Sequence, residues 1–136
     1  MVIRIQQRIT VIRRRKPEVQ SLNEELQWLG DSLGLFSLRD RDKSCFRLFI
    51  ELIKSAKRKE PLSSDELAER LQLSRGTVIH HMNRLMDSGI VVHEGRKYLL
   101  RVTNLKALVD EVKKDLSRTL DDLQSIADEI DKRLGL

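Results

Sequence analysis

The stretch LAERLQLSRGTVIHHMNRLMDSGIVV, residues 67–92, decides the fold predicted for this chain. Just before it, Ser63 and Glu66 form the pattern Ser-x-x-Glu, which is typical of a capping box at the start of a helix. A tight turn then leads to Ser74, a suitable N-cap for a following helix that ends near Gly89. The stretch therefore predicts two short helices joined by a tight turn.

The second of these helices has an apolar face and a polar face. Its apolar residues recur at helical spacing and are expected to pack inward, namely Val78, Ile79, Met82, Leu85 and Met86. The opposite face centres on Thr77, His80 and Arg84, with Gly76 beside them and His81 and Asn83 on the flanks. An exposed polar face of this kind needs a partner or solvent.

The next segment, IVVHEGRKYLLRV at residues 90–102, contains two short β-prone runs. Gly95 and Arg96 stand between the runs and suit a two-residue hairpin loop. His93, Arg96 and Lys97 are expected near the hairpin tip. A hairpin with ordinary exposed charges is the alternative.

These elements together resemble the winged helix-turn-helix of bacterial and archaeal regulators, especially the ArsR- and MarR-type families. The resemblance covers roughly residues 45–102 and rests on Leu67, Ala68, Leu71, Leu73, Ser74, Thr77, Val78, His81, Met82, Leu85, Gly89 and Ile90. It implies a mainly α fold with a small β-hairpin wing over residues 40–102. It also implies that helix 75–88 enters a DNA major groove while the wing lies along the backbone or minor groove.

The chemistry of the polar face suits that role. Arginine can bind guanine, asparagine can bind adenine, and threonine can contact a thymine methyl or a phosphate. Free N–H groups at a helix N-terminus favour a phosphate, and a glycine lets another backbone approach closely. In the resembling families a histidine at the place of His81 often buttresses the helix. The predicted nucleic-acid contacts are Ser74, Arg75, Gly76, Thr77, His80, His81, Asn83, Arg84, Arg96 and Lys97, with Arg13, Arg14, Arg15 and Lys16 nearer the N-terminus.

Metal, cofactor and catalytic chemistry are not expected. The neighbours His80 and His81 point about 100° apart on a helix, and the nearest carboxylate, Asp87, is far from His81. The cysteine motif of ArsR-type metal sensors is missing. There is no Gly-rich phosphate loop, no nucleophile–base spacing and no carboxylate pair on an apolar face. Cys45, the single cysteine, cannot form an internal disulfide and fits a buried position.

Composition predicts a soluble, cytoplasmic protein with a polyanionic partner or a solvated charged surface. The 136 residues carry a net charge of +5, and residues 1–16 hold six basic side chains and no acid. Residues 17–36 hold four acids and no base. No apolar run approaches the ~20 residues that a membrane span needs.

The flanking segments predict a basic β-arm and two amphipathic helices. Residues 2–12 alternate as a strand does, so residues 1–16 are expected to form the arm. Pro17 is expected to open a helix over residues 17–36, and Thr103 to cap a long helix over residues 103–136. Their narrow apolar stripes predict a coiled-coil dimer seam made of Val19, Leu22, Leu26, Leu29, Leu105, Val109, Val112, Leu116, Leu120, Leu123, Ile126 and Ile130. A monomeric fold-back hairpin is the alternative.

Three functions follow from these features. The first is a homodimeric transcriptional regulator that binds an inverted repeat, with two recognition helices about one turn, ~34 Å, apart. The second is a module that binds structured RNA or the ribosome through the basic arm and the segment KSAKRK at residues 54–59. The third is a protein–protein adaptor. The polar helix face favours DNA, because the deep, narrow major groove of RNA would not admit it.

Overall fold

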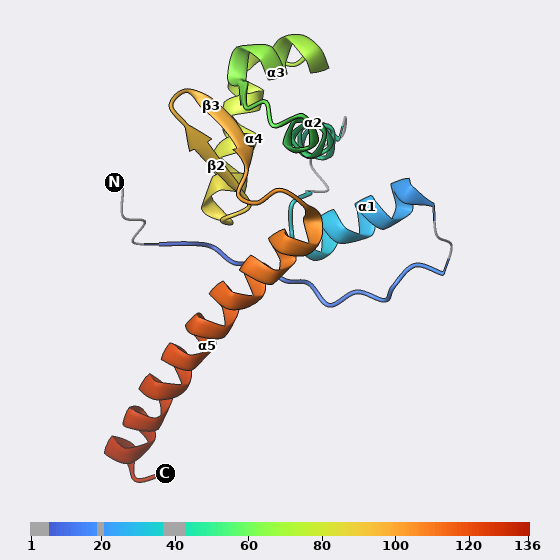
Figure 1. Ribbon diagram of the computed structural model, residues 1–136. Coiled ribbons are helices and arrows are strands. Elements are labelled where there is room, and N and C mark those ends of the chain that lie inside the picture. The colour runs from blue at the N-terminus through green and yellow to red at the C-terminus, as the bar shows by residue number, and fades with distance from the viewer. Residues whose placement is uncertain (1–5, 19–20, 37–42) are drawn as a thin grey trace.

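The computed structural model describes residues 6–18, 21–36 and 43–136 (Figure 1). In these ranges the elements follow in the order α1 (Leu22–Ser32), α2 (Ser44–Arg58), β1 (Leu62–Ser63), α3 (Ser64–Leu71), α4 (Arg75–Asp87), β2 (Val91–Glu94), β3 (Lys97–Leu100) and α5 (Leu105–Leu134). The predicted mainly α fold with a small β wing is confirmed. The prediction for Val19 and for residues 1–5 lies outside the described residues.

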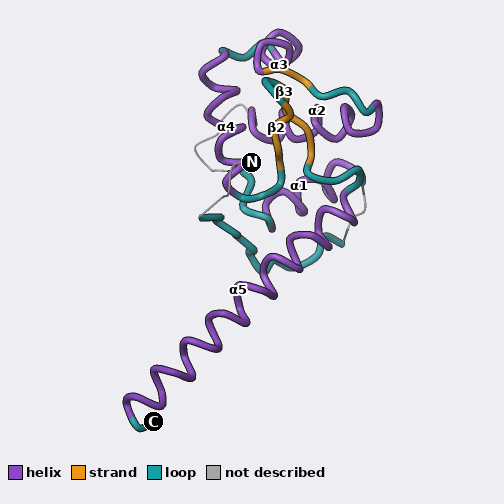
Figure 2. Tube along the Cα trace, turned by 60° about the vertical axis from the view of Figure 1, so that its left-hand side comes forward, coloured by secondary structure: helices purple, strands orange, loops and turns teal. Residues whose placement is uncertain are grey.

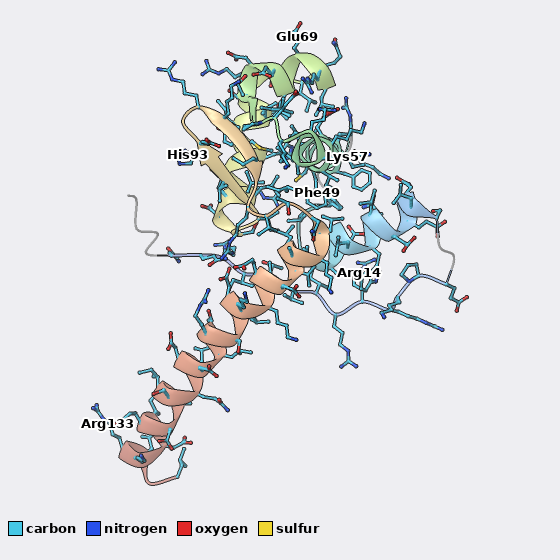
Figure 3. The ribbon with its side chains drawn as sticks, in the orientation of Figure 1. Arg14, Phe49, Lys57, Glu69, His93 and Arg133 are labelled. Atoms are coloured by element: carbon cyan, nitrogen blue, oxygen red, sulfur yellow. The ribbon has the colours of Figure 1, made fainter. Side chains whose placement is uncertain are left out.

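Helix α2 forms the centre of the core, because its middle is almost entirely apolar. Phe49 is fully buried, and the core around it takes side chains from α3, α4, the sheet and the start of α5 (Figure 3). Those neighbours include Leu67, Val78, Leu100 and Leu108. The apolar face predicted for the α4 helix is therefore the face that joins this core.

The wing contains one strand more than the predicted hairpin. Strands β2 and β3 pair antiparallel around Gly95 and Arg96, as the sequence predicts. The two-residue strand β1 adds to the other edge of β3, with Leu62 opposite Tyr98. A strand this short has no periodicity of its own, which is why the sequence does not reveal it.

The helix starts follow local capping. Ser63 and Glu66 form the predicted capping box, and the Ser74 side chain accepts a hydrogen bond from the Thr77 N–H. Two expected starts were wrong. Helix α1 begins at Leu22, not near Pro17, because Ser21 caps it, and the cap of α5 is Asn104, not Thr103.

The predicted β-arm is not a strand over its described part. Residues 6–17 form neither helix nor strand. Instead, the Arg8 N–H donates to the Asp87 carbonyl at 2.9 Å, and the Ile12 N–H donates to the Ser32 carbonyl at 2.7 Å. The last carbonyls of a helix lack partners within it, so the arm satisfies the C-terminal ends of α4 and α1 rather than pairing with a strand.

Helix α5 leaves the rest of the molecule as a long projection. Figure 2 shows its first turns beside α1 and its far end well away from every other element. Leu108 and Val112 belong to the core, whereas every residue from Ser117 to Leu136 is exposed. The helix thus has a packed base and a free distal half.

Candidate nucleic-acid interface

Helix α4 presents the predicted polar face to solvent. Arg75, Gly76, His80, Asn83 and Arg84 are all exposed, while Val78, Met82 and Leu85 are buried on the opposite side. We call the five exposed residues the recognition face. They lie on a helix whose inward side is fixed by the core, so their directions are set by the fold.

The start of α4 is held by a small hydrogen-bond network. Ser74 accepts from the Thr77 N–H at 3.1 Å and donates its hydroxyl to the Thr77 Oγ1 at 2.8 Å. Arg75 lies 3.5 Å from the carboxylate of Asp65 on α3. Ser74 and half-buried Thr77 therefore shape the helix N-terminus, where N–H groups and the helix dipole favour an anion.

Gly76 is exposed and open on the outward side. A Cβ atom added to Gly76 would meet no heavy atom within 4 Å. The intramolecular packing of the fold thus leaves room for a side chain at this position. Because Gly76 has no side chain, the backbone there is accessible to another molecule.

The two adjacent histidines have different surroundings. His80 is exposed on the recognition face, whereas His81 is only 7% exposed and faces inward. Their ring centroids lie 5.5 Å apart with the planes tilted. His81 is among the predicted nucleic-acid contacts, but its side chain is buried, which suits the buttressing position.

The wing places Arg96 at its tip. Gly95 adopts a φ of +62°, and both loop residues are exposed. Lys97 lies 3.7 Å from the Glu66 carboxylate, whose pKa is lowered by its hydrogen bonds to Ser63, with a smaller contribution from Lys97. Arg96 therefore extends from the tip, while Lys97 faces the start of α3.

The basic run at residues 13–16 lies beside α1, not beside α4. Arg14 is 4.0 Å from Asp31, Arg15 is 3.3 Å from Glu18, and the Arg15 carbonyl accepts from the Trp28 indole at 3.0 Å. Figure 3 shows Arg14 under α1. The structure therefore does not bring Arg13, Arg14, Arg15 and Lys16 to the recognition face.

The earlier part of the arm does reach α4. Arg8 and Thr10 line a hollow of about 410 Å³ together with Arg84 and Asp87 from the end of α4. The sequence did not single out Arg8, because its position depends on a contact between segments far apart in the chain. Arg84 thus has a second basic residue in its surroundings.

The described residues of the predicted dimer stripe divide into three sets. Val112 is buried in the core and Leu29 and Leu105 pack against it, so these three do not provide a free seam. Leu26 and Leu116 are half-buried. The remaining described side chains are exposed by 39–73%, namely Leu22, Val109, Leu120, Leu123, Ile126 and Ile130.

A comparison with known proteins agrees with the central part of this architecture. Residues 50–92 match a family described as winged helix-turn-helix DNA-binding. The matched span runs from α2 through α3 and α4 into β2, and so contains the recognition face. The match does not specify a subfamily. No curated protein and no solved structure matches the chain.

The matched span is similar to a winged helix-turn-helix domain of the DNA-binding type. The arm, α1, β3 and α5 lie outside that span. None of the helices in the described ranges combines the length and apolar character that crossing a bilayer requires.

Proposed function

We propose that the chain is a sequence-specific, DNA-binding transcriptional regulator that acts as a homodimer. In this proposal α4 enters the major groove and the β2–β3 wing lies along the backbone. The observation that carries the proposal is the recognition face, an exposed polar surface on the helix that follows the turn of a winged helix-turn-helix domain. Its side chains have the donors and acceptors that major-groove base edges require.

The residues of this face divide into two roles. Arg84 and Asn83 read base edges, since arginine pairs with guanine and asparagine with adenine through two hydrogen bonds each. Arg75 and the free N–H groups that follow Ser74 bind a phosphate, and Gly76 allows the DNA backbone to approach. His80, between the two groups, contacts a base edge or a phosphate.

The wing supplies contacts that carry no sequence information. Arg96 at its tip and Lys97 next to it bind backbone phosphates. Because a phosphate contact releases counterions, their contribution should weaken as the salt concentration rises. In this division α4 provides the sequence specificity, and the wing provides part of the affinity.

The distal half of α5 supports the homodimer. Leu116, Leu120, Leu123, Ala127, Ile130 and Leu134 recur in steps of four and three residues, the seven-residue repeat of a coiled coil. From Leu120 onward these positions lie on the free part of the helix, where a second copy can cover them. Two-fold pairing would present two copies of α4 to successive major grooves of an inverted repeat.

Within the winged-helix class we place the domain with ArsR- and MarR-type regulators, on the residue pattern from Leu67 to Ile90. Residues 1–40 are not part of the usual short ArsR-type pattern. The structure gives the described part of this region two positions, the arm against the ends of α1 and α4, and α1 beside the base of α5.

RNA binding by the basic run is the second candidate. It is favoured by Arg13 and Lys16, which are exposed and lie outside the winged-helix domain. Crosslinking in the native cells followed by sequencing of the bound nucleic acid separates the two. Short DNA fragments that share an inverted repeat support the regulator. Structured or ribosomal RNA would move the function to the basic run.

A matched pair of variants assigns the bound nucleic acid to its surface. One variant changes His80, Asn83 and Arg84 to Ala, and the other changes residues 13–16 to Gln. The regulator requires that the first variant lose the shared DNA sequence and that the second retain it. The opposite pattern would assign binding to the basic run.

A further inference from the structure

The carboxylate of Asp115, on α5, joins elements that are far apart in the sequence. It accepts hydrogen bonds from Arg101 at 2.6 and 3.3 Å, from Gln7 at 3.0 Å and from Arg118 at 2.6 Å. The Asp115 side chain is 6% exposed. We call Asp115, Arg101, Gln7, Glu111 and Arg118 the Asp115 junction.

Arg101 connects this carboxylate to the wing and to the end of α4. Its N–H donates to the Ile90 carbonyl at 2.9 Å, which continues the pairing of β3 with β2. Its guanidinium contacts Glu111 at 3.2 Å as well as Asp115, and it lies 3.5 Å from the Gly89 carbonyl. A displacement of α5 would therefore have to break contacts to the segment that leaves α4.

Gln7 makes a parallel connection from the arm. Its side-chain amide donates both to Asp115 and to the Ser88 carbonyl, the latter at 3.1 Å. Gly89 adopts a φ of +80°, and a Cβ added there would lie 2.3 Å from the Gln7 Nε2. The arm, the turn after α4, the end of the wing and α5 thus meet within one hydrogen-bond network.

The network holds α5 at the last point where the helix touches the domain. Beyond it, every residue from Ser117 onward is exposed. Leu134 lies 19 residues beyond Asp115, which is about 28 Å along the helix at 1.5 Å per residue, so a rotation of about 10° at the junction moves the far end by about 5 Å. Breaking the contacts at the junction would leave the buried Asp115 carboxylate without its charged partners, which is unfavourable. The ion pairs therefore favour one orientation of α5.

We propose that the Asp115 junction fixes the direction of α5 relative to α4 and thereby sets the spacing between the two DNA half-sites that a dimer accepts. This inference rests on the proposed function. Asp115 and Arg101 are then positioning residues that touch no DNA. Asp115 and Arg101 determine which spacing between half-sites the dimer accepts, while the recognition face determines which base sequence each half-site must have.

The first test compares binding to inverted half-sites separated by spacers that increase one base pair at a time. The wild-type dimer should prefer one spacer. Asp115→Asn, which keeps the shape of the side chain but removes its charge, should reduce the discrimination between spacers by about fivefold or more, the lower end of ordinary coupling between two sites. Affinity for a single half-site should not change. An unaltered spacer preference in Asp115→Asn would overturn the proposal.

Asp128→Asn is the matched control. The variant makes the same carboxylate-to-amide change on the same helix, but Asp128 is exposed and forms an ion pair with exposed Lys132 at 3.0 Å. Its spacer preference should equal that of the wild type. If Asp115→Asn does not fold, Arg101→Lys serves instead, since lysine keeps the charge and loses the two-pronged contact.

A second measurement needs no DNA and so separates the inference from the proposed function. Spin labels are placed on exposed Glu69→Cys and Ser125→Cys in one chain, diluted with unlabelled chain, and the distance between them is measured. The junction predicts a narrow distribution that broadens or shifts in Asp115→Asn. Equal distributions would overturn the inference even for a protein that binds DNA. Failure to bind DNA with a narrow distribution would instead contradict the proposed function alone.

Discussion

Gly76 is the residue at which stability and binding should separate most clearly. It lies in the first turn of α4, and the space beyond its Cα is open. Gly76→Ala should leave the free energy of unfolding unchanged or raise it by up to ~1 kcal/mol, since alanine favours a helix more than glycine does. DNA affinity should fall, because the added methyl group occupies the path of the backbone. Urea unfolding and DNA titration test both halves. Unchanged affinity would mean that no close approach occurs there.

Arg84 and Arg96 should behave differently when each is changed to Ala. The loss of Arg84 should cost about 1–3 kcal/mol and relax the sequence preference at one base position. The loss of Arg96 should weaken all DNA sites alike and reduce the salt slope by about one. Titrations on several sequences at several salt concentrations distinguish the two. Equal and sequence-blind losses would contradict base reading by Arg84.

Asp115 gives a prediction for acid stability. The hydrogen bonds from Arg101 hold the pKa of Asp115 below its ordinary value of 3.8, with Gln7 and Arg118 contributing in the same direction. A lowered folded-state pKa stabilises the protein above the unfolded-state pKa, and this contribution is lost as the pH falls through the folded-state pKa. The destabilisation by Asp115→Asn should therefore be larger at neutral pH than in strong acid. Unfolding curves recorded from about pH 7 to about pH 2 test it. If the loss of unfolding free energy in Asp115→Asn were the same at every pH, the stabilising role of the Asp115–Arg101 ion pair would be contradicted.

At the scale of the elements, local signals predicted most of the fold. The capping box at Ser63, the N-cap at Ser74 and the hairpin loop at Gly95 each depend on neighbours a few residues away. The strand expected in the arm is wrong for residues 6–12, because the alternation of side chains does not reveal that the Arg8 and Ile12 N–H groups bond to helix ends. The periodicity of apolar residues describes one segment at a time, so it does not predict contacts between segments that are far apart in the chain.

The recognition face could likewise be predicted from helical periodicity, with one exception. Residues of α4 alternate between core and solvent at helical spacing, which predicts correctly that His80 and Arg84 face outward, whereas Asn83 and His81 are both expected on the flanks and only Asn83 is exposed. His81 lay on the boundary between the faces, and its neighbours in the core decide its burial. The surroundings of Arg84 depend on Arg8 in the arm, which no pattern near α4 indicates.

The two halves of α5 should respond oppositely to substitution. Leu123 is 60% exposed on the free half, so Leu123→Lys should abolish dimers while the thermal stability of the monomer is retained. Leu108 is fully buried, so Leu108→Ala should destabilise the fold by about 2–5 kcal/mol. Sedimentation equilibrium and thermal unfolding measure the two effects. A wild-type chain that is already monomeric at high concentration would contradict the dimer seam.

The whole molecule consists of a winged-helix domain and a projecting helix that meet at the Asp115 junction. The sequence predicted both parts, but not the junction between them. Gln7 and Asp115 are 108 residues apart, and Arg101 and Asp115 belong to different elements. An arginine and an aspartate in a chain so rich in charges carry no signal of pairing, so only the folded arrangement brings them together.

The proposed dimer is compatible with the geometry at the same scale. Helix α5 projects away from the domain (Figure 1), so pairing through its distal half would leave both copies of α4 uncovered. A two-fold arrangement of this kind binds a DNA site that is itself an inverted repeat. In the proposed regulator, α4 would determine which base sequence is bound, and α5 would determine the symmetry of the site.

The most direct test of the central claim is selection of binding sites from random double-stranded DNA, performed with the wild-type chain and with a variant in which His80, Asn83 and Arg84 are changed to Ala. The wild type should enrich one inverted repeat, and the variant should retain only weak, salt-sensitive binding without a shared sequence. If the wild type enriches no sequence, or if the variant enriches the same repeat, then α4 does not read DNA and the proposed function is wrong.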